Sequence, residues 1–181
     1  AVDAETTILM NAGQADGVAI QGTAVGDGSV EVYDLNAFSD AVLSGIDLDL
    51  TIDIANNGRN DSPVALGSSA EIAVAAGKAL TVTSDNDGTN DVLDVTQAAV
   101  FSIDASGNPG SVIVDPDTNL KMTANQATGH AVTGAGSVDI VDIEATLGAD
   151  LSAIDTDLTI DLEADGRTSD IVLTSASIDV A

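Results

Sequence analysis

The sequence predicts an all-β protein, and three observations lead to that fold class. Short stretches in which Val, Ile or Leu alternate with Asp, Thr or Ser recur along the 181 residues. Clusters of Gly, Asn and Asp separate these stretches, commonly at a spacing of about 10 residues. No stretch sustains the i, i+3, i+4 apolar stripe of an amphipathic helix.

Eleven stretches are expected to be strands because each is short, rich in β-branched residues and bounded by turn formers. In chain order they are residues 7–10, 18–22, 30–35, 48–54, 70–75, 79–83, 92–95, 100–105, 111–115, 120–124 and 131–134. Only residues 34–46 and 94–100 suggest a turn or two of helix.

The chain also repeats itself. Residues 2–17 align with residues 114–129 and share eight of sixteen positions. After a shift of four residues, GSVEVYDL at position 28 matches GSVDIVDI at position 136, and IDLDLTIDIANNGR at 46–59 matches IDTDLTIDLEADGR at 154–167. We therefore expect a first repeat unit of about 110 residues at 1–112 and part of a second unit at 113–181.

The expected architecture is a β-solenoid of the parallel β-helix type, in which the two units could form one continuous coil. Its narrow interior suits aliphatic side chains, and Tyr33, Phe38 and Phe101 are the only aromatic residues. Tandem immunoglobulin-like sandwiches are the alternative, because about 100 residues and seven or so strands also match the repeat.

Charge limits the partners. Thirty acidic residues against four basic ones give a net charge of −26, although 44% of the residues are hydrophobic, enough for a folded core. Nucleic acid and anionic membranes are excluded as direct partners by repulsion. Divalent cations are the expected counterpart, and solubility in a salt-rich medium is the alternative explanation. The chain has no Cys, so disulfides and thiolate metal sites are absent.

Residues 84–94, SDNDGTNDVLD, form the best candidate cation loop. Asp85, Asp87, Asp91 and Asp94 would supply oxygen ligands for Ca²⁺, and Gly88 would permit a sharp bend. The bidentate Glu that closes an EF-hand loop is missing. A plain turn between strands is the competing interpretation.

The duplicated phrase D-x-D-L-T-I-D offers two further candidate cation faces. Side chains alternate along a strand, so the acidic residues lie on one face and Leu50, Ile52 and Ile54 on the other. The acidic residues are Asp47, Asp49 and Asp53 in the first copy and Asp155, Asp157 and Asp161 in the second. Carboxylates on neighbouring strands would repel by about 0.9 kcal/mol per pair even in water, and bound cations would remove that cost. A solvated acidic face, or neutralisation by the following Arg59 and Arg167, are the alternatives.

Catalysis is not expected. His130 is the only histidine, no GxSxG motif is present, and a turn position explains His130 best. Paired carboxylates could serve glycoside cleavage in a β-helix enzyme, but such clefts use aromatic and basic residues that are scarce in this chain.

The segments ILMNAGQADGVAIQGTAVGDGSVEVYDL and LKMTANQATGHAVTGAGSVDIVDI resemble the tandem β-strand repeats of large acidic secreted bacterial surface proteins, of the adhesin, surface-layer or matrix type, often exported by type I secretion. The resemblance implies a non-enzymatic, calcium-responsive role outside the cell. The calcium-binding GGxGxDxx nonapeptides of type I secreted toxins are absent, so no ligand set carries over. We expect a segment that self-assembles into a layer, filament or matrix; an adhesin stalk is the alternative, and a polysaccharide-acting enzyme is a distant third.

Overall fold

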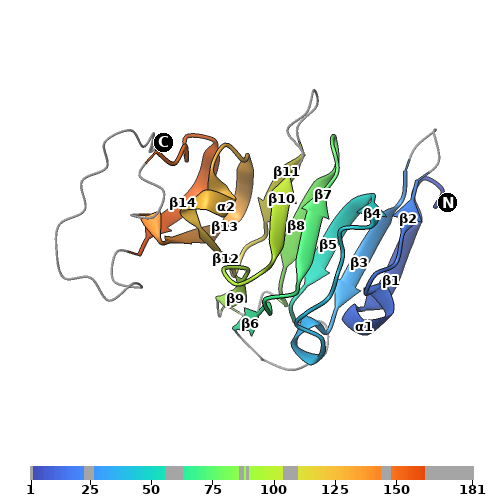
Figure 1. Ribbon diagram of the computed structural model, residues 1–181. Helices are drawn as coiled ribbons and strands as arrows, with labels where there is room; N and C mark the ends of the chain where they lie inside the picture. The colour runs from blue at the N-terminus through green and yellow to red at the C-terminus, as the bar shows by residue number, and fades with distance from the viewer. Residues whose placement is uncertain are drawn as a thin grey trace.

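The computed structural model describes residues 2–22, 27–55, 63–85, 88, 90–103, 110–143 and 148–161. These residues form a mostly β structure with very little helix (Figure 1). The first seven strands are β1 (Thr7–Asn11), β2 (Ile20–Gln21), β3 (Ser29–Tyr33), β4 (Ile46–Asp47), β5 (Asp49–Asp53), β6 (Val64–Ala65) and β7 (Glu71–Val74). The next seven are β8 (Ala79–Thr83), β9 (Asp91–Asp94), β10 (Val100–Ile103), β11 (Ser111–Val114), β12 (Thr118–Thr123), β13 (Val132–Val141) and β14 (Ile154–Ile160). The helical elements are α1 (Ala12–Ala15), α2 (Ala124–Ala127) and the 3₁₀ turn η1 (Leu35–Ala37).

One strongly curled sheet contains most of the strands, in the order β1-β3-β5-β8-β11-β13-β12-β9-β6, and β14 pairs with β13. We call β1, β3, β5, β8 and β11 the first arm, and β12, β9 and β6 the second arm. Two small sheets, β2-β4 and β7-β10, lie beside it. Every named strand pair is parallel, and Figure 1 shows β1 and β14 toward opposite ends of the row of strands.

Strand β13 joins the two arms because it is long and bent. Residues Val132 to Gly134 pair with β11, whereas Ser137 to Val141 pair with β12. The bend is made by Gly134, whose φ of 126° disfavours other residues, and by Gly136, where a Cβ would collide with the carbonyl oxygens of Asp115 and Thr118. These two glycines let one strand serve both arms.

The core consists of aliphatic side chains stacked in columns along the arms. On the first arm and its continuation the column is Ile8, Val30, Leu50, Leu80, Val112, Val132 and Ile154, each paired with the next. On the second arm it is Val64, Leu93, Leu120, Val138 and Leu158. Alternation of inward aliphatic and outward polar residues puts these side chains on the inner face, and most are completely buried. No helix in the described part of the chain is long and apolar enough to cross a membrane.

The sequence correctly predicted a mostly β fold, and each of the eleven predicted stretches overlaps a strand in its described residues. The parallel pairing differs from the antiparallel pairing of an immunoglobulin-like sandwich. Of the two suggested helical stretches, residues 34–46 contain only η1, and residues 94–100 contain no helix. The four-residue helices α1 and α2 were not predicted, because a single turn leaves no apolar periodicity to detect.

Candidate functional site

The two repeat copies fold alike in the described residues, down to strand register. Thr7 on β1 pairs with Ser29, and the corresponding residue Asn119 on β12 pairs with the corresponding Ser137. Ser29 in turn pairs with Asp49, just as Ser137 pairs with Asp157. Backbone outliers repeat as well, because the corresponding pairs Glu5 and Asp117, and Asp34 and Asp142, all have φ between 56° and 64°. The repeated sequence therefore specifies the same three-strand layer twice.

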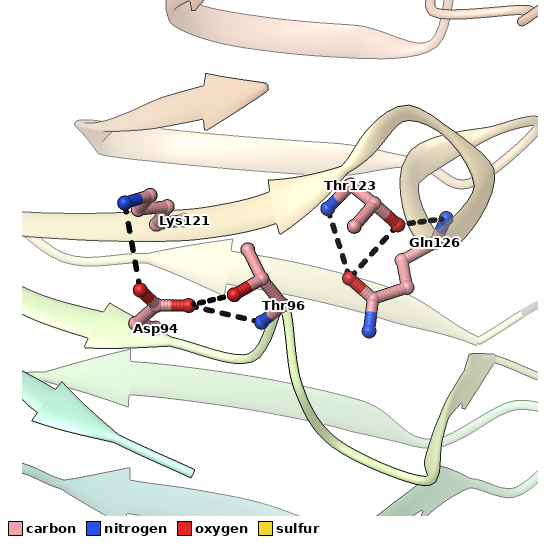
Figure 2. Close-up of polar contacts among 5 residues, drawn as sticks. All are labelled: Asp94, Thr96, Lys121, Thr123 and Gln126. Atoms are coloured by element: carbon pink, nitrogen blue, oxygen red, sulfur yellow. Dashed lines mark hydrogen bonds and ion pairs between the residues drawn. The ribbon is translucent and has the colours of Figure 1, made fainter. Parts of the chain in front are cut away.

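Helices α1 and α2 are closed by the same capping box at the end of β1 and β12. In the first copy Asn11 Oδ1 accepts from Gln14 N at 2.9 Å, and Gln14 Oε1 accepts from Asn11 N at 3.0 Å. In the second copy Thr123 Oγ1 accepts from Gln126 N at 3.2 Å, and Gln126 Oε1 accepts from Thr123 N at 2.8 Å (Figure 2). Reciprocal bonds of this kind satisfy the free N–H groups of a first helical turn. The conserved spacing of Asn or Thr to Gln was the signal that could have revealed these turns.

The first predicted acidic face has the predicted alternation. Leu50, Ile52 and Ile54 are buried at 3%, 0% and 6% exposure, whereas Asp47 and Asp49 are exposed. Asp53 is half-buried and accepts a hydrogen bond from Ala55 N at 3.0 Å. Asp49 accepts from Ala79 N at 2.8 Å and so holds the start of β8. Part of this face therefore stabilises the backbone of the next strand.

Lys78 is the cation that the structure places beside the first acidic face. Its Nζ donates a hydrogen bond to Asp27 in an ion pair. The hydrogen bond to Asp27, together with attraction to Asp27, Asp49 and Asp47, raises the pKa of Lys78 above its usual value. The neighbouring strand residues opposite Asp49 and Asp53 are uncharged: Ser29 and Tyr33 on β3, and Thr83 opposite Asp53 on β8. Because of this register, Asp49 and Asp53 do not face the carboxylates on adjoining strands that the sequence had suggested.

The second predicted acidic face lies on β14 and just after it. Asp155, Asp157 and Asp161 are all exposed, and strand pairing sets Asp155 beside Thr133 and Asp157 beside Ser137. Within the described ranges, no group of three or more Asp, Glu, His or Cys side chains has the geometry to hold a metal ion. Cation binding at either face stays a prediction.

The predicted cation loop is only partly described, because Asp87 lies outside the described residues. Asp85 is exposed, whereas Asp91 is buried at 4% exposure. Asp94 points into a polar cluster instead: its carboxylate accepts from Thr96 N at 3.0 Å and from Thr96 Oγ1 at 2.6 Å (Figure 2). Asp94 is thus committed to a turn that follows β9.

A charge ladder crosses the second arm. Lys121 on β12 pairs in register with Asp94 on β9 and with Asp139 on β13. Its Nζ lies 3.5 Å from Asp94 Oδ2 (Figure 2). Opposite charges on adjacent strands stabilise a sheet by up to about 1 kcal/mol. Lys78 and Lys121 thus each form an ion pair with one aspartate; the remaining basic residues, Arg59 and Arg167, lie outside the described residues.

His130 follows α2, and its backbone N donates to Ala127 O at 3.1 Å. Burial of the ring lowers its pKa below the usual value. This is the turn position that the sequence predicted.

An open groove of about 650 Å³ runs between the two small sheets, past β2 and β4 on one side and β7 and β10 on the other. Among the described residues that line it, Asp47 is the one with an ionisable side chain, alongside Gln21, Ser44 and Ser102. Glycoside cleavage needs two carboxyl groups facing one bond, and the described lining of this groove contains one.

No family model, curated protein or solved structure matches the chain. The features that distinguish the chain are the duplicated layer, the aliphatic columns and the acidic outer surface.

Proposed function

We propose that this chain is a structural repeat segment of a secreted or cell-surface protein that self-assembles into a layer, filament or matrix, and that its backbone coils as a β-solenoid. The observation that carries this proposal is the repeated three-strand layer, in which register, capping and unusual backbone angles recur between the two copies. A unit whose own copies stack in the same chain is suited to building an extended structure.

The solenoid is supported by the spacing of the paired residues. Along the first arm, residue partners are separated by about 20 to 32 positions in the sequence, as in Val30 with Leu50, Leu50 with Leu80, and Leu80 with Val112. Intervals of that size, combined with parallel pairing, are typical of one strand per turn of a coil. Each turn then buries its inner face against the turns before and after it.

Calcium, or another divalent cation, is the proposed stabilising partner. The chain carries 30 acidic residues, and Lys78 and Lys121 neutralise only a few of them. Assembly brings many carboxylates closer together, so cations that bind the assembled form better than the free chain would favour assembly by mass action. The proposed role is non-catalytic and uses neither nucleic acid nor direct contact with anionic membranes.

The test is to add Ca²⁺ to the purified chain at about 0.15 M NaCl and to follow light scattering and electron micrographs, with EDTA reversal. Mg²⁺ at the same concentration separates calcium binding from general charge screening. Ordered polymers that appear with Ca²⁺ and dissolve with EDTA would support the proposal. A chain that stays monomeric and only gains thermal stability would instead favour the stalk of an adhesin. If neither the melting temperature nor the association state changes with Ca²⁺ or EDTA, the proposed stabilisation by calcium is wrong.

A further inference from the structure

Strand β1 ends the first arm, and its outer edge exposes apolar side chains. Among the described strands it pairs only with β3. Leu9 is 57% exposed, and the inward-facing Ile8 and Met10 are only partly buried. None of the five residues of β1 is charged, in a chain whose net charge is −26. An uncharged strand edge meets no charge repulsion from an approaching strand and is therefore suited to pairing with it.

The second repeat copy shows what covering this edge achieves. Strand β12 corresponds to β1, and its equivalent edge is covered by β9. As a result Leu120 and Met122, the counterparts of Ile8 and Met10, are buried at 0% and 1% exposure. The same strand therefore occurs twice in one molecule, once with this edge covered and once without a partner on this edge among the described strands.

The outer edge of β1 presents backbone N–H and C=O groups that a parallel strand could bond. Thr6 O accepts from Ser29 N at 2.9 Å, so the backbone groups of Ile8 and Met10 face β3 and those of Thr7 and Leu9 face outward. On β12, Lys121 O accepts from Val95 N at 2.9 Å, on the side of β9. Lys121 is the counterpart of Leu9, so both strands present the same backbone groups to this side.

Strand β14 pairs only with β13 among the described strands, and its outer edge is complementary to that of β1. Leu158 and Ile160 are partly buried, whereas their counterparts Leu50 and Ile52 are buried at 3% and 0% exposure beside β8. Asp161 N donates to Ile140 O at 2.8 Å, which turns the backbone groups of Leu158 and Ile160 away from β13. In this phase they can bond to the outward groups of a strand such as β1.

We propose that β1 binds the outer edge of β14 in a second copy of this chain, in parallel, with Leu158 opposite Ile8 and Ile160 opposite Met10. This register extends the aliphatic columns across the junction and sets Thr159 opposite Leu9. It also places the exposed Asp157 beside Thr7 and the exposed Asp161 beside Asn11, and both partners are uncharged. The inference rests on the proposed structural role and names the surface through which assembly occurs.

Cysteine cross-linking tests the register, because the chain contains no Cys of its own. Neighbouring strands lie about 4.8 Å apart, within the Cα separation that a disulfide spans. Leu9→Cys and Thr159→Cys are made in separate chains, mixed under assembly conditions and oxidised. The expected product is the mixed Leu9→Cys with Thr159→Cys dimer. A dimer formed by Leu9→Cys alone would show β1 against β1, and overturns the proposal.

An edge-blocking variant supplies the second measurement. Leu9→Pro removes an N–H that points away from β3, so the fold is retained while a junction hydrogen bond is lost. We expect association, measured by sedimentation velocity in about 1 M NaCl to screen repulsion, to weaken by roughly tenfold or more. The control is Phe38→Ser, which removes the second large hydrophobic side chain that is exposed in the described residues, 40% exposed, and should leave association unchanged.

The outcomes separate this inference from the proposed function. Assembly of the unmodified chain without the mixed cross-link, or equal weakening by Leu9→Pro and Phe38→Ser, overturns the β1–β14 junction and leaves self-assembly standing. Absence of assembly in the unmodified chain, with and without Ca²⁺ and salt, overturns both.

Discussion

The repeat provides a matched pair of side chains, Gln14 and Gln126, whose loss should cost different amounts of stability. Gln126 is half-buried: its Oε1 accepts from Thr123 N and Thr123 Oγ1 at 2.8 and 3.1 Å, and its Nε2 donates to Val95 O at 2.8 Å. Gln14 is exposed, and within the described residues its side chain makes one hydrogen bond, accepting from Asn11 N at 3.0 Å. Gln126 thus ties α2 to the turn after β9, whereas Gln14 only caps α1.

The expected magnitudes follow from these bonds. A hydrogen bond contributes about 0.5–1.5 kcal/mol net, so Gln126→Ala should lower the free energy of unfolding by about 2–3 kcal/mol and Gln14→Ala by about 1 kcal/mol. The intrinsic helix preference of Ala cancels in the comparison, because both residues occupy the third position of a four-residue helix. The difference attributable to the contacts of Gln126 is therefore about 1–2 kcal/mol.

Urea unfolding of both variants, fitted with a common slope, measures this difference. Gln126→Glu is the companion variant, because it keeps the oxygen that caps α2 and replaces the donor to Val95 O with a carboxylate oxygen that repels this carbonyl; its cost should exceed that of Gln14→Ala. Equal losses for Gln14→Ala and Gln126→Ala would refute the reasoning that the bond across to Val95 carries the extra stability.

Three further predictions use the same logic. Met122→Ala should lower the free energy of unfolding by about 2–5 kcal/mol, and Met10→Ala by clearly less, because Met122 is 1% exposed and Met10 only partly buried; equal losses in urea unfolding would mean that the open edge of β1 is covered in solution. Gly136→Ala should destabilise by about 1–3 kcal/mol or more, since its methyl group would meet two carbonyl oxygens, whereas Ala135→Ser at the exposed neighbouring position should be neutral in the same assay. The imidazole NMR signals of His130 should titrate with a midpoint below 6.5, because burial disfavours the charged ring. Folded protein should therefore lose stability as pH falls below about 6.5, a slope that His130→Asn should remove and that would be absent if the ring were solvated.

The strands could be predicted from the sequence because their signal is local. In residues 48–54, aliphatic and polar residues alternate, and the structure buries Leu50, Ile52 and Ile54 as that pattern requires. The repeat further indicated that two segments would share one conformation, and β1 and β12 do so down to their capping boxes. Features that depend only on a few neighbouring residues, such as strands and turns, could therefore be predicted.

The neighbours of each carboxylate could not be predicted, because they depend on register between distant segments. Lys78 pairs with Asp27, 51 positions earlier in the chain, and no local pattern announces this contact. The carboxylate repulsion suggested for Asp49 and Asp53 does not arise from the adjoining strands, because register opposes them with Ser, Tyr and Thr. The bend at Gly134, which divides the sheet into two arms, depends in the same way on the position of β11 beneath it.

The bent strand β13 has one more effect, on how the molecule looks from outside. Because β1 and β12 carry matching sequences but belong to different arms of a curled sheet, the two copies of the repeat present the same motif in different directions. An antibody raised against that motif would therefore find its two epitopes on separate arms of the sheet. Each repeat of such a chain thus carries its motif on an arm of the sheet other than the one that carried the previous copy.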